Sequence, residues 1–280
     1  MKKILVPYDF SEVAVHALDF ACQIATKAES EIYLLNVIEH PTIDSFRTMG
    51  MQDIDPMEQL YIKRMIETVE GKLSDVVSSA KYEDEMIKYK IQLGNPFSNI
   101  IDEIAEKQVD LLVVGTEGAE GLNEFFVGSN AEKLVRKASC PVITLQNKSE
   151  LEPIENIVFA SDFMNTDDEF VAKLKSLQEM FEAKLNIVKI NTPASFTSTR
   201  HDRKQMEDFV EKYDISDYNI DIYNHRNEED GITNYAEDIK ADMIALGTHQ
   251  RKGVGHFLVG SIAEDIVNHA SIPVWTSHLS

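Results

Sequence analysis

The 280-residue sequence has few of the residues that build disulfide-bonded or metal-bound domains. Its two cysteines, Cys22 and Cys140, form no Cys-x-x-Cys pair, and the eight histidines show no spacing typical of a metal site. We therefore expect no metal site and a reducing compartment.

Basic residues are scarce as well. The chain has 27 lysines and arginines against 48 aspartates and glutamates, which gives a net charge of −21. Such a negative surface repels nucleic-acid phosphates and anionic lipid, so neither nucleic acid nor a membrane is expected as a partner. A local pocket of backbone N–H groups can still hold a small anion.

Long apolar runs are also missing, because none approaches the roughly 20 residues that a membrane span needs. The apolar start at residues 3–7 is broken by Tyr8 and Asp9, too early for a signal peptide. These features predict a soluble cytoplasmic protein. At roughly 150 residues per domain, the length predicts about two domains.

The first half of the chain recurs in the second half. Three segments recur at a constant offset of 132 residues: 110–116 at 242–248, 126–132 at 258–264, and 138–142 at 270–274. The starts also correspond, since residues 3–10 resemble residues 156–163 at an offset of 153. The chain is therefore a tandem duplication, with roughly 21 extra residues in the first half that we place at 41–58.

Each half alternates strands with helices. The first half predicts strands at 3–7, 31–38, 86–93, 111–114 and 142–145, and helices at 11–27, 57–78, 95–107 and 129–138. The second half predicts strands at 157–160, 185–190, 218–223, 243–246 and 274–277, and helices at 168–183, 200–213, 231–240 and 261–270.

This order predicts an α/β fold with two tandem, doubly wound, five-stranded parallel sheets covered on both faces. We expect domains at residues 1–147 and 153–280, joined by a linker at 148–152. The final strands of the two sheets are expected to pair, which would make an intrachain pseudo-dimer.

A ligand of such a sheet binds beyond the carboxyl ends of the strands, where the strand order reverses. The segment there reads Gly115-x2-Gly118-x9-Gly128-Ser129. Ser129 and Asn130 begin a predicted helix, whose free N–H groups suit a phosphate. Ser129-x-x-Glu132 and Ser261-x-x-Glu264 are also capping boxes, which would explain the same serines without a ligand. The spacing alone leaves both interpretations open.

At these residues the sequence resembles the universal stress protein family in its tandem form. The glycine-rich segment matches the family's ATP-binding signature, and the start at Pro7 to Asp9 and the final strand after Cys140 support the match. The resemblance implies an adenine nucleotide alpha hydrolase-like fold, dimerisation along the last strand, and a regulatory role in stress response rather than efficient catalysis. It implies ATP or another adenine nucleotide, with or without Mg²⁺. The implied nucleotide-binding residues are Pro7, Asp9, Val37, Gly115, Thr116, Gly118, Gly128, Ser129 and Asn130.

The second half departs from the signature, because Gln250 stands where the second glycine is expected. A side chain there would hinder close approach of the backbone to a ligand. Charge favours the opposite assignment, since the second loop carries His249, Arg251, Lys252 and His256 where the first carries glutamates. We favour the first half. A second site would comprise Asp162, Ile190, Gly247, Thr248, His249, Gly260, Ser261 and Ile262.

Three functions compete: a nucleotide-binding regulatory module, a slow ATPase or nucleotidyl transferase on the same site, and a scaffold that binds no nucleotide. Asp9 and Asp162 could serve as catalytic carboxylates or simply as turn residues. We expect no catalytic residue and a regulatory protein partner that the sequence does not identify. A homo-oligomer is compatible with the remaining surfaces.

Overall fold

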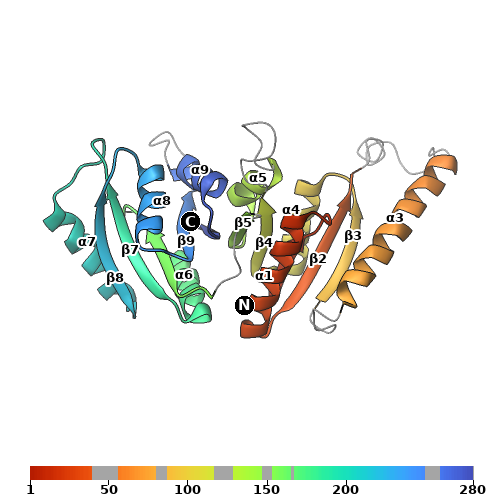
Figure 1. Cartoon of the computed structure of the whole chain (residues 1–280), viewed down its shortest axis with the longest axis horizontal. Coiled ribbons are helices and arrows are strands. Elements are labelled where there is room, and N and C mark those ends of the chain that lie inside the picture. Colours follow the sequence, from red (N-terminus) through yellow and green to blue (C-terminus); the bar gives the residue numbers. More distant parts are fainter. Residues whose placement is uncertain are drawn as a thin grey trace. The chain divides into compact units, whose positions relative to one another are not determined.

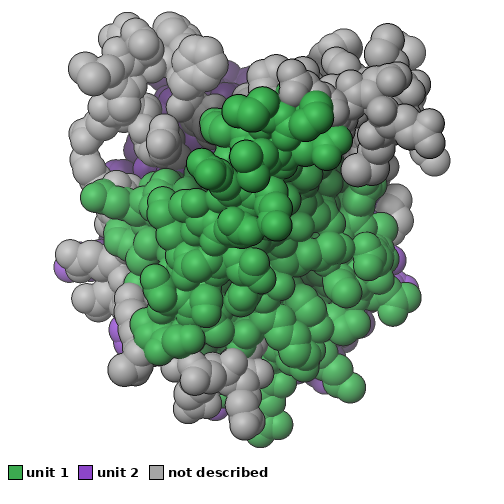
Figure 2. Space-filling view, turned by 90° about the vertical axis from the view of Figure 1, so that its right-hand side faces the viewer, with its two compact units in different colours: residues 1–114 green, residues 115–280 purple. Residues whose placement is uncertain are grey.

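The computed structural model describes residues 1–39, 56–79, 87–116, 129–146, 153–164, 167–249 and 259–279. They form two compact units, Met1–Val114 and Gly115–Ser280, which Figure 2 colours green and purple. The expected extra segment at 41–58 lies almost entirely outside the described residues.

The first unit is a parallel sheet in which helices connect successive strands (Figure 1). Its elements are β1 (Lys3–Pro7), α1 (Glu12–Ala28), β2 (Glu31–Ile38), α3 (Pro56–Val77), β3 (Ile87–Leu93), α4 (Pro96–Lys107) and β4 (Leu111–Thr116), whose last two residues belong to the second unit. The strand order is β3-β2-β1-β4, and all pairs are parallel. Ile4, Leu5 and Val6 follow one another with no exposed surface, so both faces of the sheet are covered.

The second unit holds a longer sheet with the order β5-β10-β9-β6-β7-β8. Its elements are α5 (Ser129–Lys137), β5 (Val142–Gln146), β6 (Asn156–Ala160), α6 (Asp168–Phe181), β7 (Lys184–Asn191), α7 (Thr199–Tyr213), β8 (Tyr218–Asn224), α8 (Glu228–Asp238), β9 (Met243–His249), α9 (Val259–His269) and β10 (Val274–Leu279). Neighbouring strands are parallel except β5 and β10, which are antiparallel. The predicted α/β fold class is confirmed.

The compact units do not coincide with the two sequence repeats. The elements α5 and β5 belong to the first repeat by sequence but to the second unit by contact. The reason is the pairing of β5 with β10, which joins the last strand of the first repeat to the strands of the second repeat. The domains 1–147 and 153–280 therefore remain a proposal that follows the repeat.

Local sequence explains where the helices begin. Ser11 caps α1 by accepting a hydrogen bond from the Ala14 N–H at 3.2 Å. Asn95 caps α4 in the same way, and Pro96 stands at the first helical position. Asp167 and Asn227 cap α6 and α8, and the acidic residues in the first turns of both helices interact favourably with the positive end of the helix dipole.

Two predicted helix starts are wrong. Helix α8 begins at Glu228 and not at 231, because its polar first turn lies outside the apolar repeat that guided the prediction. Helix α9 begins at Val259 and not at Ser261. Val259 stands four residues before Ala263, so it extends the helical spacing by one turn. Ser261 is therefore the third residue of the helix and not the residue before it.

Candidate functional site

The candidate site of the first repeat is built on the turn that leaves β1. The Asp9 side chain is exposed, and its Oδ1 accepts a hydrogen bond from the Ser11 N–H at 3.0 Å. This bond closes a local turn, which is the structural role expected of an Asp in this place. Because Asp9 has two carboxylate oxygens, the turn leaves acceptor capacity toward solvent.

Asn36 fixes this turn from the neighbouring strand. Its side chain is buried, and its Nδ2 donates to the carbonyl oxygen of Tyr8 at 2.7 Å. The Tyr8 N–H donates in turn to the carbonyl oxygen of Leu35 at 2.9 Å, which extends the pairing of β1 and β2 by one residue. Val37, two residues further along β2, is half-buried. The turn is therefore positioned by backbone and amide contacts.

Phe10, next to Asp9, has a left-handed backbone with φ of 69°. A left-handed aromatic residue is uncommon and requires support from its surroundings. The Phe10 ring packs edge-on against Tyr8 with centroids 5.3 Å apart, and the Lys72 ammonium of α3 lies 5.4 Å from the ring centroid. Phe163 is the counterpart of Phe10 in the second repeat and has a φ of 59°. Both repeats therefore keep the same strained turn.

The other predicted residues of the first site lie at the ends of β4 and α5. Gly115 and Thr116 are the last two residues of β4, and Thr116 Oγ1 donates to the Leu145 carbonyl oxygen at 3.2 Å. Ser129 is the first residue of α5 and Asn130 the second. Gly118 and Gly128 lie outside the described residues. Since β1 and β4 are parallel neighbours, their carboxyl ends share one edge of the sheet.

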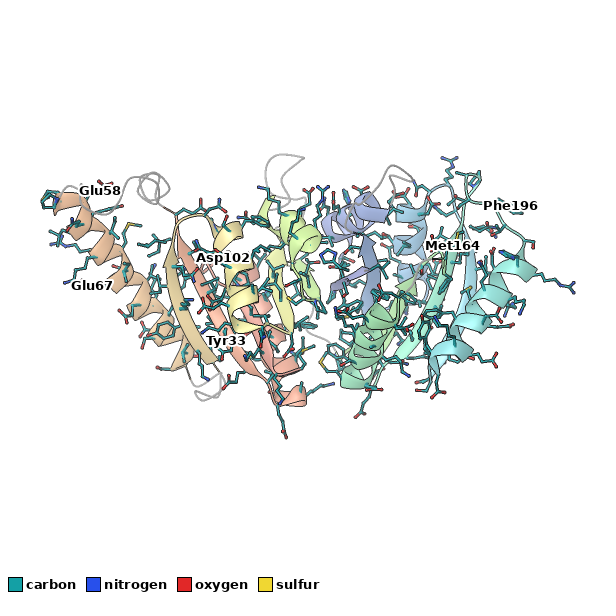
Figure 3. All side chains as sticks on the ribbon, turned by 180° about the vertical axis from the view of Figure 1, so that it is seen from behind. Tyr33, Glu58, Glu67, Asp102, Met164 and Phe196 are labelled. Atoms are coloured by element: carbon teal, nitrogen blue, oxygen red, sulfur yellow. The ribbon has the colours of Figure 1, made fainter. Side chains whose placement is uncertain are left out.

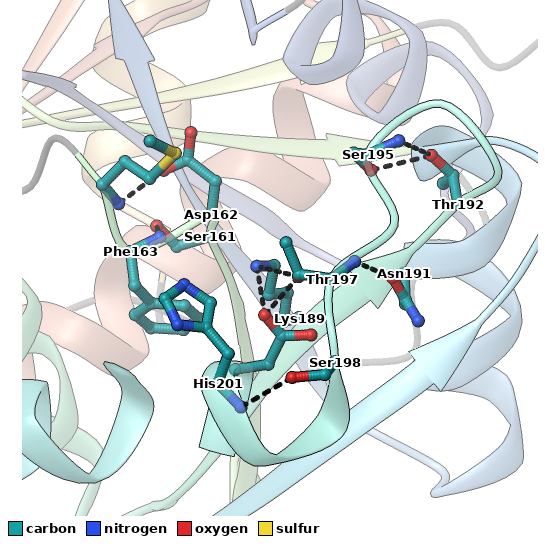
Figure 4. Close-up of polar contacts among 12 residues, drawn as sticks. Ser161, Asp162, Phe163, Lys189, Asn191, Thr192, Ser195, Thr197, Ser198 and His201 are labelled. Atoms are coloured by element: carbon teal, nitrogen blue, oxygen red, sulfur yellow. Dashed lines mark hydrogen bonds and ion pairs between the residues drawn. The ribbon is translucent and has the colours of Figure 1, made fainter. Parts of the chain in front are cut away.

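The second repeat builds the same turn after β6 (Figure 4). Asp162 Oδ1 accepts from the Met164 N–H at 2.9 Å, and Ser161 Oγ accepts from the Phe163 N–H at 3.0 Å. Asp162 is exposed like Asp9, and Met164 is 72% exposed at the surface (Figure 3). The two aspartates therefore share their local geometry.

The neighbouring strand differs sharply between the repeats. At the position of Asn36, the second repeat has Lys189, whose ammonium donates to Thr197 and Asp202. The Lys189 ammonium lies 2.6 Å from Asp202 Oδ1 of α7 and 3.0 Å from Thr197 Oγ1, and Thr197 also donates to Asp202 (Figure 4). Asp202 has no exposed surface and the Lys189 side chain only 9%. This buried ion pair fixes α7 and the preceding loop to β7.

A second polar cluster follows the end of β7. Glu228 Oε1 accepts from the hydroxyls of Thr192 and Ser195, both at 3.0 Å. Its counterpart in the first repeat is Pro96, which carries no charge. Ile190 is buried, and its Cγ2 lies 2.6 Å from where a Cβ on Gly231 would stand. The carboxyl end of β7 is therefore closely packed and carries a carboxylate.

The remaining predicted residues of the second site lie along β9 and α9. Gly247 and Thr248 pair with Ser277 and His278 of β10, and His249 ends β9. Thr248 Oγ1 lies 2.8 Å from His278 Nδ1, and burial lowers the pKa of His278. Gly260, Ser261 and Ile262 lie in the first turn of α9. Among the described residues, no group of three or more His, Cys, Asp or Glu side chains could hold a metal ion.

Comparison with known proteins identifies the family to which the chain belongs. The sequence profile of the universal stress protein family matches residues 1–146 and 153–278, so the protein contains two copies of the family's domain and belongs to that family. Two relatives from Methanocaldococcus jannaschii, universal stress proteins MJ0531 and MJ0577, are each 28% identical. The matches cover 52% and 53% of this chain and 82% and 96% of the two relatives, so each relative matches about half of the chain.

A solved structure has the same fold over the whole chain. The crystal structure of a universal stress protein from Archaeoglobus fulgidus superposes with a TM-score of 0.74 at 20% identity, covering 99% of this chain and 98% of the other. A protein of Pseudomonas aeruginosa gives a TM-score of 0.62 at 18% identity, with 100% of this chain and 93% of the other covered. At these identities the likeness shows the fold alone. The described part of the chain has no helix long and apolar enough to cross a membrane.

Sequence reasoning identified the motif residues but missed the side chains that distinguish the two repeats. Asn36, Lys189 and Asp202 carry no motif, and each looks like an ordinary polar residue of a strand or helix. Aligning the repeats at the offset of 153 would have placed a lysine opposite an asparagine within an apolar strand. Such a change in a buried strand is the signal that could have found them.

Proposed function

We propose that this protein is a cytoplasmic regulatory module of the stress response that binds ATP or a related adenine nucleotide in its first repeat. One observation carries the proposal: the exposed Asp9 carboxylate stands on a turn held rigidly at the carboxyl edge of β1, between β2 and β4. A carboxylate in this place can accept hydrogen bonds from the hydroxyls of a ribose.

The contrast with the second repeat supports this choice. Its strand β7 carries the buried Lys189–Asp202 pair where β2 carries Asn36, and Glu228 places a carboxylate beyond the strand end. A carboxylate repels the phosphates of a nucleotide. Gln250 also replaces the glycine that corresponds to Gly118. The Glu228 carboxylate and the missing glycine therefore favour the first repeat, while the charges of the glycine-rich loops favour the second.

In the proposed complex the base and ribose contact Pro7, Asp9 and the backbone at Val37. The phosphates lie against the backbone N–H groups of the glycine-rich segment and the start of α5, where the helix dipole favours negative charge. The residues proposed for this role are Gly115, Thr116, Gly118, Gly128, Ser129 and Asn130. A Mg²⁺ ion would accompany a triphosphate and neutralise part of its charge.

We further propose that the protein acts by changing protein partners with nucleotide occupancy, and not by efficient catalysis. The pairing of β5 with β10 supports an intrachain pseudo-dimer, which leaves other surfaces for a partner protein or for a homo-oligomer. The described residues contain no motif that identifies this partner.

The test is isothermal titration with ATP on protein stripped of bound nucleotide. Asp9→Asn keeps an oxygen that can accept from Ser11, so the turn should persist while the carboxylate charge is lost. Asp162→Asn is the matched control, because Asp162 makes the same turn in the second repeat. We expect Asp9→Asn to weaken ATP binding at least tenfold and Asp162→Asn to leave it unchanged.

Two other results would point elsewhere. If stripped protein gives no heat with ATP and no rise in melting temperature, the nucleotide-free scaffold is the better account. If phosphate is released over hours and the release stops with Asp9→Asn alone, the protein is a slow ATPase on this site. Equal loss of ATP binding in Asp9→Asn and Asp162→Asn would contradict the assignment to the first repeat.

A further inference from the structure

The junction of β5 and β10 has local two-fold symmetry in its backbone. Ile143 pairs with Trp275, and these residues are exact counterparts at the repeat offset of 132. On either side of them, Thr144 Oγ1 donates to the Val274 carbonyl oxygen at 3.3 Å, and Thr276 Oγ1 donates to the Val142 carbonyl oxygen at 3.4 Å. The same bond is thus made twice, once in each direction.

The side chains on this local axis are not symmetric. Ile143 and Trp275 stand opposite each other in the strand register, the first a smaller and the second a larger apolar residue, and both are buried. The Trp275 ring also packs against Phe170 of α6, with centroids 5.7 Å apart. A tightly packed interior tolerates neither a missing indole nor a second one without rearrangement. The packing at the axis is therefore suited to one residue of each kind.

Charge is asymmetric in the same way where α5 meets α9. Glu132 and Glu264 are counterparts at the offset of 132, as are Arg136 and Asn268. The Arg136 Nε lies 2.9 Å from Glu264 Oε1, and its Nη1 lies 3.9 Å from Glu132 Oε1. One guanidinium from the first repeat therefore neutralises a glutamate from each repeat.

Glu264 depends on this arginine because the glutamate side chain is largely shielded from solvent. Its side chain is only 17% exposed, against 45% for Arg136 and 37% for Glu132. Burial raises the pKa of Glu264, the carboxylates of Glu132 and Asp265 raise it further, and Arg136 opposes them. A buried carboxylate that loses its partner is strongly destabilising.

We infer that the β5–α5 surface and the β10–α9 surface recognise each other and not their own kind, and that Arg136 and Trp275 set this choice. Two β10–α9 surfaces would bring Glu264 against Glu264 with no arginine and would crowd two indoles on the axis. Two β5–α5 surfaces would leave the volume of the indole unfilled between Ile143 and its copy. The inference rests on the intrachain pairing and is independent of nucleotide binding.

A charge exchange in the full chain tests the recognition. Arg136→Glu places three carboxylates together, so we expect the melting temperature to fall by several degrees and chromatography with light scattering to show self-association. Adding Glu264→Arg restores one arginine between two glutamates, so we expect at least half of the loss to be recovered. The control is Lys204→Glu, which breaks an exposed pair with Asp208 at 3.0 Å on α7 and should change neither readout.

Failure of recovery in the exchanged variant, or a single variant no different from the control, would overturn the inference. If Arg136→Glu does not fold, Arg136→Asn is the variant to use. It introduces the residue that the second repeat has at this position, Asn268, and removes the arginine that pairs with Glu264. Adding Glu264→Gln to that variant should then recover melting temperature, because the buried charge is gone. A purely structural role for the Arg136 side chain predicts no such recovery.

Discussion

The buried Lys189–Asp202 pair makes the sharpest prediction about stability. Replacing Lys189 with Met keeps most of the volume of the side chain but leaves Asp202, which has no exposed surface, without its cation. Removal of one partner of a buried pair costs about 3–5 kcal/mol in free energy of unfolding. Thr197 still donates to Asp202, so we expect a value near the lower end of that range.

The control is Lys204→Met on α7, the helix that carries Asp202. Lys204 and Asp208 are 72% and 60% exposed, and an exposed pair of this spacing contributes about 0.3–0.5 kcal/mol. The double variant Lys189→Met, Asp202→Leu should recover most of the lost free energy of unfolding. Exchanging a buried ion pair for apolar residues of similar volume changes stability little.

Urea unfolding followed by tryptophan fluorescence measures these differences. The single tryptophan, Trp275, is 1% exposed and lies in the same compact unit as Lys189, so its emission reports on that unit. If Lys189→Met costs no more than Lys204→Met, or if the double variant is less stable than Lys189→Met, the account of the buried pair is wrong.

Further predictions concern glycine and histidine. Gly71 in α3 has open space where a Cβ would stand, so Gly71→Ala should stabilise the protein by about 0.5–1 kcal/mol in thermal unfolding. Gly231→Ala in α8 should destabilise it in the same assay, because the new Cβ would lie 2.6 Å from Ile190 Cγ2; stabilisation there would contradict the close packing. Burial lowers the pKa of His278. The neutral side chain therefore contributes fully to the free energy of unfolding above the ordinary pKa of about 6.5, and this contribution is lost as the pH falls below that value. His278→Gln, which introduces the residue of the first repeat, should flatten the dependence of unfolding free energy on pH as the pH falls below about 6.5, and an unchanged slope would refute this role.

The fold could be predicted because its signals are local and repeated. Short apolar strands separated by helical spacing identify a parallel sheet, and a second copy of the same order removes most of the ambiguity. Helix starts were harder to predict, because the polar first turn of α8 lies outside the apolar stripe. Asn227, a standard capping residue, was the signal that would have placed α8 correctly.

The candidate site was predictable only where a motif marks it. Asp9 and Gly115 stand in recognisable segments, but Asn36 acts through one amide contact with the backbone of Tyr8. Arg136 and Glu264 meet only because β5 pairs with β10, and nothing in the sequence near either residue records that meeting. Contacts between distant segments follow from the packing of the whole sheet, which one sequence does not specify residue by residue.

The central claim is that one nucleotide binds per chain and that the first repeat holds it. Native mass spectrometry of the stripped protein with added ATP counts bound molecules directly. We predict a single added ATP that disappears with Asp9→Asn and persists with Asp162→Asn. Two bound nucleotides, or one that survives Asp9→Asn and is lost with Asp162→Asn, would contradict the account.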